Sequence, residues 1–424
     1  MNYLSQWLTF RQVQRALSYD ADRLRQVQWR KLRGLVAHAY ESIPFYRQQL
    51  DQAGVRPDDL RSLDDLSRLP VIRKADLQAA EPDSLISRRY RKEDLVREQT
   101  SGSSGRPFAM YFDTAYRLVR KALFMRALKS CGYRLGQRML FVTSHHHRDK
   151  KVPAWTGWRY VSYKDAPEDN LRVLNEYRPR LVYGWVTPIR RMAQVARERG
   201  IAVHRPAAMV TTAETLDAPT RQLLEETFGC PVYEIYGLTE TGTLAWRSPA
   251  WQGFRISHES LIVEFAPADD GGPARRLIVT NLALWTMPFI RYDTDDLAVP
   301  AQAAGNGQMP YLERVEGRLV DCVRLADGRV ILPFQLTMAM EEVPGVVRYQ
   351  IRQDDLGHFT IRYEAKVNGS SDQGPTVEAI RRVMRGVLGE AVEVEAKLEK
   401  SLDPPPGRKF RVVESCLGVG GGGR

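Results

Sequence analysis

The stretch RLVYGWVTPIRRMAQVARERGIAVHRPAAMVTT (Arg180–Thr212) carries the pattern that decides the fold. The apolar runs RLVYG and AAMVTT are typical of strands, and the segment PIRRMAQVARERG between them is typical of a helix. Strand-type RMLFVT (138–143) and helix-type EDNLRVLNEY (168–177) precede this stretch, and helix-type APTRQLLEETFG (218–229) and strand-type PVYEIYG (231–237) follow it. We therefore predict a sheet flanked by helices in an α/β layer architecture.

The residues after Gly237 have a different pattern. ESLIVEFAP (259–267), ARRLIVTNLA (274–283) and MPFIRYDTDDLAVP (287–300) predict strands of a β-rich subdomain. Farther along, GRLVDCVRLADGRVILP (317–333) has an Asp-Gly turn between two short β runs, which predicts a hairpin.

The rest of the chain predicts a small α+β unit. Its helix-type segments are FQLTMAMEEV and TVEAIRRVMRGVLG, and its strand-type segments are VVRYQIRQ, HFTIRYEAKV and AVEVEAKL. We place the boundary near Arg318–Asp321, so that residues 1–320 form a large N-terminal domain and residues 321–417 a small C-terminal domain. The Gly-rich tail, residues 418–424, is expected to be disordered.

The composition is that of a globular protein of two or three domains, with 424 residues, 43% hydrophobic and 27% charged. No secretory signal or membrane-spanning run is present in the sequence, and the four cysteines form no C-x-x-C pair. We therefore expect a cytoplasmic protein with reduced thiols and no membrane association. The net charge of +11 is spread among acidic and apolar residues, which favours an anionic small substrate over nucleic acid as the partner.

The segment TSGSSGRP (Thr100–Pro107) is either an exposed linker or a loop that holds phosphate. It lies between structured elements, since Leu118, Ala122 and Leu128 follow at helical spacing. It matches neither a Walker A loop nor a dinucleotide-binding loop. What remains is a short loop with several hydroxyl groups, which could surround a polyphosphate with N–H and O–H donors.

Three further segments carry candidate chemistry. In YGLTETG, Glu240 follows a strand and is either a solvated loop residue or a Mg²⁺ ligand. In RYDTDDL, Asp295 and Asp296 could hydrogen-bond the hydroxyl groups of a ribose, although an exposed turn has the same composition. In DPPPGRKFRVV, Lys409 lies on a Pro/Gly-rich turn, where most lysines are surface charges.

Together and in this order, these segments resemble the adenylate-forming enzymes, specifically the phenylacetate-CoA ligase and CapK-like branch. TSGSSGRP resembles the phosphate loop of that family, YGLTETG its Tyr-Gly-x-Thr-Glu motif, IRYDTDDL its ribose segment and GRLVDCVRLADGRVILP its hinge. The resemblance covers nearly the whole chain. It implies the fold of those enzymes, in which a small mobile C-terminal domain follows the large N-terminal domain.

The resemblance also implies roles for individual residues. It implies that the loop and Thr239 contact the phosphates of ATP, that the adenine stacks on Tyr236 and that Asp296 binds the ribose. It also implies that Glu240 binds Mg²⁺ and that Lys409 supports adenylation. Asp321 matches the hinge. The nucleotide-binding set is Thr100, Ser101, Gly102, Ser103, Ser104, Gly105, Tyr236, Gly237, Thr239, Asp296 and Arg318.

The chain departs from the family pattern at Asp295, where the family often has glycine, and this adds a negative charge near the nucleotide. It also lacks the cysteines that bind metal in some relatives, so we predict no structural zinc. The acyl-substrate candidates are Tyr183, Gly184 and Trp185 at a strand end, Glu214 at a family position beside the acyl site and the adenine, and His146. Simple core packing is the alternative for Tyr183, Gly184 and Trp185. For His146 the alternatives are a surface or structural position and a metal site.

We therefore predict an enzyme that uses ATP and Mg²⁺ to convert a carboxylic acid to an acyl-adenylate, and then transfers the acyl group to CoA. An aryl or arylacetic acid is the expected substrate class. Two alternatives stay open: transfer to a carrier-protein thiol or an amine, and a non-catalytic nucleotide-binding protein. The oligomeric state, a monomer or a homodimer, also stays open.

Overall fold

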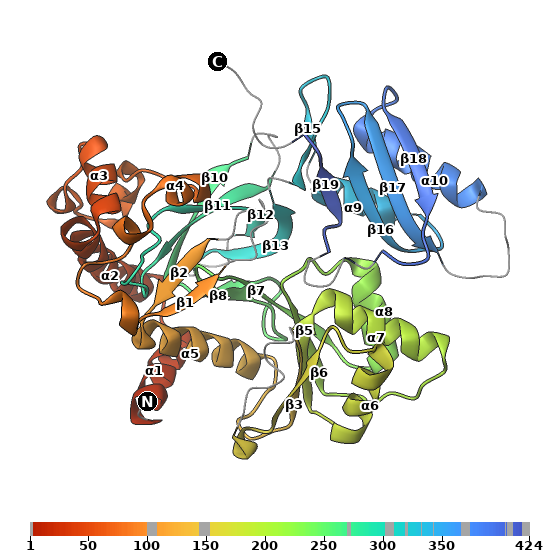
Figure 1. Cartoon of the computed structure of the whole chain (residues 1–424), viewed down its shortest axis with the longest axis horizontal. Coiled ribbons are helices and arrows are strands. Elements are labelled where there is room, and N and C mark those ends of the chain that lie inside the picture. Colours follow the sequence, from red (N-terminus) through yellow and green to blue (C-terminus); the bar gives the residue numbers. More distant parts are fainter. Residues whose placement is uncertain are drawn as a thin grey trace. The chain divides into compact units, whose positions relative to one another are not determined.

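The computed structural model describes residues 3–99, 108–143, 153–268, 273–301, 309–318, 321–331, 333–341, 343–365, 374–402, 404 and 410–417. These residues belong to two compact units (Figure 1). The first consists of Met1–Ser130, Tyr236–Pro267 and Pro273–Arg314, and the second of Cys131–Ile235, Ala268–Gly272 and Val315–Arg424.

The first unit combines helices with antiparallel strands. Its helices are α1 (Tyr3–Arg15), α2 (Ala21–Ser42), α3 (Pro44–Gln52), α4 (Lys74–Ala79) and α5 (Thr114–Ser130). Its strands are β1 (Val96–Gln99), β2 (Ala109–Phe112), β8 (Gly242–Trp246), β9 (Arg255–Ile256), β10 (Leu261–Pro267), β11 (Arg275–Asn281), β12 (Tyr292–Ala301) and the first half of β13 (Tyr311–Arg318). The sheet β10-β11-β12-β13 is the predicted β-rich subdomain.

Helix α2 shows how the local sequence produces these elements. The Asp20 carboxylate caps it by accepting a hydrogen bond from the N–H of Arg23 (2.8 Å). The buried residues recur at spacings of three and four, which gives one apolar face; they are Leu24, Gln28, Leu32, Leu35, Val36, His38, Ala39 and Ser42. Pro44 stops this helix and occupies the first turn of α3.

The second unit contains the predicted α/β layers. Its parallel strands lie in the order β4-β3-β5-β6-β7. They are β3 (Met139–Thr143), β4 (Trp158–Ser162), β5 (Leu181–Trp185), β6 (Ala208–Thr212) and β7 (Val232–Leu238). Helices α6 (Pro167–Tyr177), α7 (Val186–Glu198) and α8 (Ala218–Phe228) cover one face of this sheet, as Figure 1 shows, and share a core with it. Every strand and helix predicted between residues 138 and 237 is confirmed.

The C-terminal residues form the predicted α+β elements. Strands β14 (Val323–Arg324) and β15 (Val330–Ile331) make the Asp-Gly hairpin. A second sheet has the order β18-β17-β16-β19. Its elements are β16 (Val346–Gln353), β17 (His358–Ala365), β18 (Glu393–Leu398) and β19 (Val413–Ser415), and α9 (Pro333–Glu341) and α10 (Gly374–Leu388) pack on it. These C-terminal residues and the α/β layers belong to the same compact unit. The domain boundary near residue 320 therefore stays a prediction.

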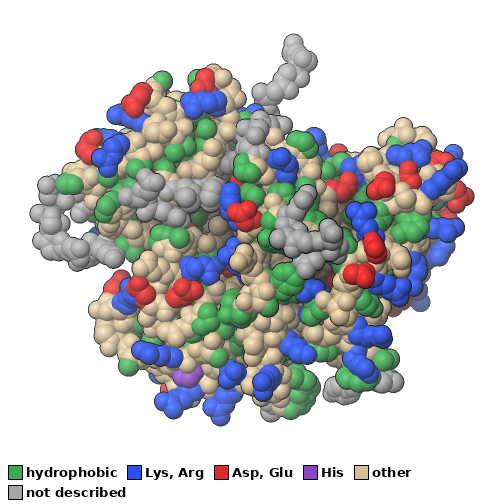
Figure 2. Space-filling model, turned by 180° about the vertical axis from the view of Figure 1, so that it is seen from behind, with side chains coloured by type: hydrophobic (Ala, Val, Ile, Leu, Met, Phe, Trp, Pro, Cys, Tyr) green, Lys and Arg blue, Asp and Glu red, His purple; other side chains and the backbone are tan. Residues whose placement is uncertain are grey.

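The surface of the protein carries mixed charge. Figure 2 shows Lys and Arg side chains scattered over the visible face, with Asp and Glu side chains between them. Many of these groups form exposed ion pairs, for example Arg172 with Asp169 and Arg197 with Glu226. Within the part of the chain that the structure describes, no helix has the length and apolar character needed to cross a membrane.

Candidate functional site

The end of strand β7 is shaped by two glycines. A Cβ atom at Gly237 would lie 2.4 Å from the carbonyl oxygen of Gly242, so only glycine fits there. Gly242 itself has a φ of 69°, which glycine adopts without strain. Thr239 and Glu240 lie in the turn between these two positions.

Glu240 is held in place by three side chains. Its carbonyl oxygen accepts hydrogen bonds from the hydroxyl of Tyr116 (3.2 Å) and from Nδ2 of Asn281 (2.9 Å). Asn281 also donates to the Tyr116 hydroxyl oxygen (2.7 Å). The Glu240 carboxylate accepts a hydrogen bond from the hydroxyl of Tyr292 (3.3 Å), and the residue is 8% exposed. These hydrogen bonds stabilise the turn, with the carboxylate bonded to Tyr292.

The electrostatics of this turn suit a cation. Burial, and then the charge of Glu240, raise the pKa of Tyr292, so its hydroxyl stays a donor at all ordinary pH values. Among the described residues of this unit, no Lys or Arg side chain is ion-paired with the Glu240 carboxylate. A mostly buried carboxylate without a basic partner fits a Mg²⁺ ligand, because magnesium is usually bound through one or two carboxylates and phosphate oxygens.

The segment predicted to bind ribose contains a β-bulge. Arg276 on β11 is opposite Leu297, but Ile278 is opposite Asp293, so β12 has extra residues between these pairs. Thr294 closes the bulge: its hydroxyl donates to the carbonyl oxygen of Leu277 (2.9 Å) and accepts from the N–H of Asp296 (3.1 Å).

Asp295 has a φ of 59°, in the left-handed region where glycine is favoured. This backbone conformation explains why a glycine would suit the position, and why aspartate, which tolerates this region better than most residues, can replace it. The N–H of Asp295 donates to Oδ1 of Asp293 (3.1 Å), which stabilises the turn.

Tyr236 and Asp296 meet directly. The hydroxyl of Tyr236 donates a hydrogen bond to Oδ2 of Asp296, which is 5% exposed. The Tyr292 hydroxyl, which donates to the Glu240 carboxylate, comes from the same strand, β12, as Asp296. Tyr236, Glu240 and Asp296 are therefore gathered at one place in the first unit, although they lie up to 60 residues apart in sequence.

Tyr183 belongs to an aromatic cluster on the sheet face opposite the helices. Phe141 is at its centre, with its ring 4.5 Å from that of Tyr160 and 5.6 Å from that of Tyr183. Trp185 stacks on Tyr163, with 5.1 Å between the ring centroids. Burial raises the pKa of Tyr183 to about 12, so its hydroxyl is neutral.

Gly184 has a packing role. A Cβ atom there would lie 2.5 Å from the carbonyl oxygen of Val142 on the neighbouring strand β3. The glycine thus lets β5 and β3 approach closely between the two aromatic positions of β5.

Glu214 follows β6, after Ala213, whose φ of 72° turns the chain. Its carboxylate accepts hydrogen bonds from the N–H of Thr187 (2.7 Å) and from the N–H of Phe410 (3.3 Å). It therefore joins the start of helix α7 to the C-terminal residues.

The other predicted residues are described only in part. Thr100–Gly105, His146 and Lys409 lie outside the described residues, as does the tail 418–424; for Arg318 the structure describes only the backbone. The strands that flank the predicted phosphate loop, β1 and β2, pair in antiparallel register, with Gln99 opposite Ala109. Asp321 forms an ion pair with Arg411.

Three residues that position the site were not predicted from the sequence: Tyr116, Asn281 and Tyr292. Tyr292 lies within the quoted ribose segment, in the same strand as Asp296, and that proximity was an available signal. Tyr116 and Asn281 are 165 residues apart, and nothing in their local patterns indicates that they meet.

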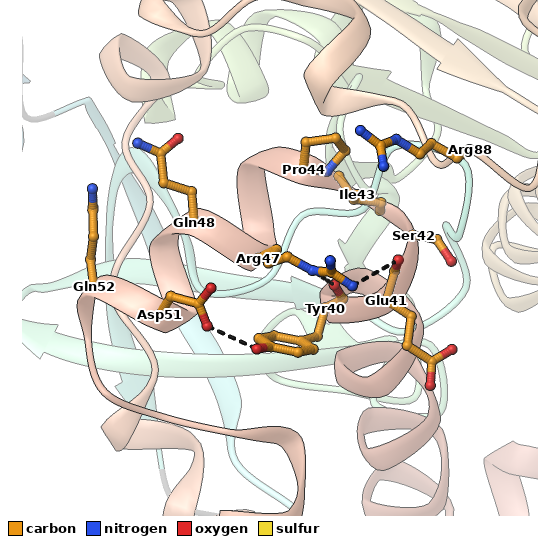
Figure 3. Close-up of a pocket in the computed structure, with 10 residues that line it drawn as sticks. All are labelled: Tyr40, Glu41, Ser42, Ile43, Pro44, Arg47, Gln48, Asp51, Gln52 and Arg88. Atoms are coloured by element: carbon orange, nitrogen blue, oxygen red, sulfur yellow. Dashed lines mark hydrogen bonds between the residues drawn. The ribbon is translucent and has the colours of Figure 1, made fainter.

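A surface pocket of ≈ 370 Å³ lies elsewhere in the first unit (Figure 3). It is lined by Tyr40, Glu41, Ser42, Ile43, Pro44, Arg47, Gln48, Asp51, Gln52 and Arg88. Its polar groups bond one another: Tyr40 donates to Asp51 (2.9 Å), and Arg47 donates to the carbonyl oxygen of Tyr40 (2.9 Å). No residue predicted from the motifs lines this pocket.

Comparison with known proteins confirms the resemblance. No family model matches the chain. It is 27% identical over 354 residues to a phenylacetate-coenzyme A ligase of Thermus thermophilus, covering 78% of each chain. It is 24% identical over 401 residues to a phenylacetate-coenzyme A ligase of Aromatoleum evansii, covering 89% of this chain and 90% of the relative.

Solved structures agree on the fold. A 2-hydroxyisobutyryl-CoA ligase in the postadenylation state, in complex with R3-HIB-AMP, superposes with a TM-score of 0.77 at 19% identity, covering 93% of this chain and 90% of that one. An anthranilate CoA ligase in complex with anthranoyl-AMP superposes with a TM-score of 0.53 at 13% identity, covering 81% and 72%. The fold is that of the adenylate-forming enzymes.

Proposed function

We propose that this protein activates a carboxylic acid with ATP and transfers the acyl group to CoA. In the first step a carboxylate oxygen attacks the α-phosphorus of ATP, the bond to pyrophosphate breaks, and an acyl-adenylate forms. In the second step the CoA thiolate attacks the acyl carbonyl and AMP leaves. The observation that carries the proposal is the meeting of Tyr236, Glu240 and Asp296, in a chain that resembles acid-CoA ligases along most of its length.

The residues of the first unit suit the first step. Asp296 is a buried carboxylate able to accept a hydrogen bond from a ribose hydroxyl, and the bond from Tyr236 fixes its orientation. Glu240 would hold Mg²⁺, which when bound neutralises phosphate charge. Little acid-base chemistry is needed, because the attacking carboxylate is already ionised; the protein contributes orientation and charge.

Further residues complete the proposal, most of them in segments that the structure does not describe. The loop Thr100–Gly105 would contact the phosphates, and Lys409 would support adenylation with its ammonium group. Arg318 and Asp321 are assigned to the nucleotide and the hinge. These roles come from the resemblance of the motifs.

The aromatic cluster supports an aryl or arylacetic acid as substrate. Phe141, Tyr160 and Tyr183 pack on one another in stacked and edge-to-face geometries, and an aromatic substrate ring could pack on the same cluster in the same way. Trp185 stacks at the end of the same strand. His146 remains a candidate from the sequence.

The alternative to CoA as the acyl acceptor is a carrier-protein thiol or an amine. Turnover without CoA, when such an acceptor is supplied, would identify this alternative. ATP and CoA suit the cytoplasmic location predicted from the sequence; a homodimer is one of the two oligomeric states to test.

The experiment that tests the proposed function is exchange of labelled pyrophosphate into ATP over a panel of carboxylic acids. We expect exchange that depends on the acid and is strongest with aryl or arylacetic acids. Absence of exchange with every acid would favour a non-catalytic nucleotide-binding protein.

A further inference from the structure

Helix α1 packs on helix α5 through one of its faces. Val13 shares a small core with Ala122 and Leu123 of α5, and the ring of Phe10 packs against this core. A guanidinium nitrogen of Arg126 also donates to the carbonyl oxygen of Val13 (3.1 Å). Figure 1 shows the two helices side by side. These contacts determine which face of α1 points outward.

The outward face of α1 carries two large apolar side chains. Trp7 is 51% exposed and Leu8 is 52% exposed. Arg11 follows Trp7 by four residues and Arg15 follows Leu8 by seven, so the four side chains lie on the same side of the helix. The guanidinium carbon of Arg11 lies 4.6 Å from the centre of the Trp7 ring, which is a cation–π contact. Apolar and cationic groups are therefore exposed together.

The charge of this surface has a single sign. The sequences of α1 and α5 contain no Asp or Glu. Lys121 and Lys129 of α5 are exposed, and both contact α1. Within the described part of the chain, Arg11, Arg15, Lys121 and Lys129 form no ion pair, whereas the more buried arginines of α5 do. The α1 surface is defined here by Trp7, Leu8, Arg11, Arg15, Lys121 and Lys129.

We propose that the α1 surface docks on an anionic phospholipid bilayer. Tryptophan favours the boundary between headgroups and acyl chains, and the Leu8 side chain gains by entering the apolar region. The aliphatic stems of Arg11 and Arg15 can lie along that region while their guanidinium groups reach the lipid phosphates. A helix that lies on the surface needs no membrane-spanning length. The docking is independent of the proposed function.

The combination of groups favours a bilayer over a soluble polyanion. A nucleic acid attracts cations through its phosphates and could stack a base on Trp7. It offers no apolar environment for Leu8, whereas a bilayer accepts both the cations and the leucine. Binding to a bilayer should therefore depend on Leu8 as well as on the arginines.

The test is co-sedimentation of the full-length protein with vesicles. We expect binding to vesicles of phosphatidylcholine with phosphatidylserine, and much weaker binding to phosphatidylcholine alone. Binding should also weaken when the salt is raised from about 0.1 M to about 1 M, since the Debye length then falls from about 10 Å to about 3 Å.

Two variants separate the charge from the apolar contact. Arg11→Gln combined with Arg15→Gln should lower the partition onto the anionic vesicles by about 25-fold, because each basic residue near such a surface contributes about fivefold. Leu8→Gln should lower it by at least about tenfold, because the side chain no longer gains from entering the apolar region. All three positions are exposed, so urea unfolding of both variants should match that of the unsubstituted protein.

Matched controls change the same groups elsewhere. Arg172→Gln combined with Arg197→Gln removes two exposed arginines, and so the same net charge, from ion pairs outside the α1 surface. Leu356→Gln removes a leucine that is 47% exposed and follows two aspartates, Asp354 and Asp355. Both controls should keep the partition within about twofold of the unsubstituted protein.

Three results would overturn the proposal. The first is absence of binding to the anionic vesicles. The second is an equal loss of binding in the Arg172 and Arg197 control, because the effect would then come from net charge alone. The third is a loss in the Arg11 and Arg15 variant with Leu8→Gln bound as before, which would indicate a soluble polyanion such as a nucleic acid as the partner.

Discussion

At the scale of single residues, Glu240 is the group on which adenylation should depend most. Its carboxylate is mostly buried, and Tyr292 supplies its hydrogen bond. Glu240→Gln keeps the shape and that bond but removes the charge. We predict at least about a 100-fold fall in pyrophosphate exchange, which is typical for loss of one electrostatic contact to a transition state. Exchange measured against Mg²⁺ concentration checks this; an unchanged rate and Mg²⁺ dependence would contradict the role of Glu240.

Asp295 allows a second residue-scale prediction. Its left-handed backbone suits glycine, and its charge lies next to the proposed ribose-binding Asp296. Asp295→Gly should keep the fold and lower the KM for ATP by about fivefold. The reason is that the variant removes repulsion between the Asp295 carboxylate and the phosphates of ATP, and two unit charges about 4 Å apart in water repel by about 1 kcal/mol. Asp295→Asn removes the charge alone and should have the same effect on the KM. If both variants leave the KM as it is, the aspartate does not act on the nucleotide.

At the scale of elements, helix α7 connects the α/β layers to the C-terminal sheet. Its apolar side, with Ile189 and Met192, packs into the core of the α/β layers. Its other side carries Arg190, which forms an ion pair with Glu364 on β17 (3.1 Å); their side chains are 2% and 10% exposed. Glu364 also accepts from Gln194 (3.2 Å).

Breaking this buried pair should be costly. Arg190→Met leaves a buried carboxylate without its cation, and we predict a loss of about 3–5 kcal/mol in the free energy of unfolding, measured with urea. The exposed pair of Arg172 and Asp169 is the control, because Arg172→Met should leave the free energy of unfolding nearly unchanged. Similar small losses for both variants would show that the Arg190 contact is not a stabilising one.

The elements were more predictable than their contacts. Apolar periodicity located the strands and helices of the α/β layers except β4 (Trp158–Ser162), because these elements depend on residues close in sequence. The strand predicted over residues 287–300 begins only at Tyr292. Phe289 and Ile290 are buried but lie outside the strand, because an apolar side chain indicates burial and not the type of element. The sequence could not show that Arg190, and not Arg191, forms the buried ion pair, because the partner Glu364 is 174 residues away.

The same limit applies to the site. Motif order located Tyr236, Glu240 and Asp296, and the structure joins Tyr236 to Asp296. The contact of Glu214 with Phe410 could not be predicted in this way, because the two residues are 196 positions apart and no local sequence pattern indicates that they meet. Spatial pairs of this kind become visible only in three dimensions.

At the scale of the whole molecule, stability should fall in mild acid because of His258. The side chain is buried, and burial lowers its pKa to about 4, against 6.5 for an ordinary histidine. Between these pH values the unfolded chain binds a proton at His258 that the folded protein does not bind. His258 therefore does not reduce the free energy of unfolding above pH 6.5, and it reduces it progressively as the pH falls below 6.5. The loss by pH 5 is about 2 kcal/mol, at 1.36 kcal/mol per pH unit.

His258→Gln checks this prediction. Glutamine can still donate to the carbonyl oxygen of Pro310, as Nε2 of His258 does (2.8 Å). The variant should lose about 2 kcal/mol of the pH dependence of unfolding between pH 6.5 and pH 5. His358→Gln is the control: Asp355 raises the pKa of this exposed histidine, so its contribution is lost as the pH rises and its removal cannot reduce the loss in acid. An unchanged pH dependence in His258→Gln would contradict the account of His258.

The central claim is that Tyr236, Glu240 and Asp296 surround one nucleotide. A crystal structure of the protein with Mg²⁺ and a non-hydrolysable acyl-adenylate analogue tests it most directly. We predict the adenine against Tyr236, the ribose hydroxyls on Asp296 and Mg²⁺ on Glu240. A nucleotide bound elsewhere, with Asp296 still bonded to Tyr236 alone, would contradict the claim.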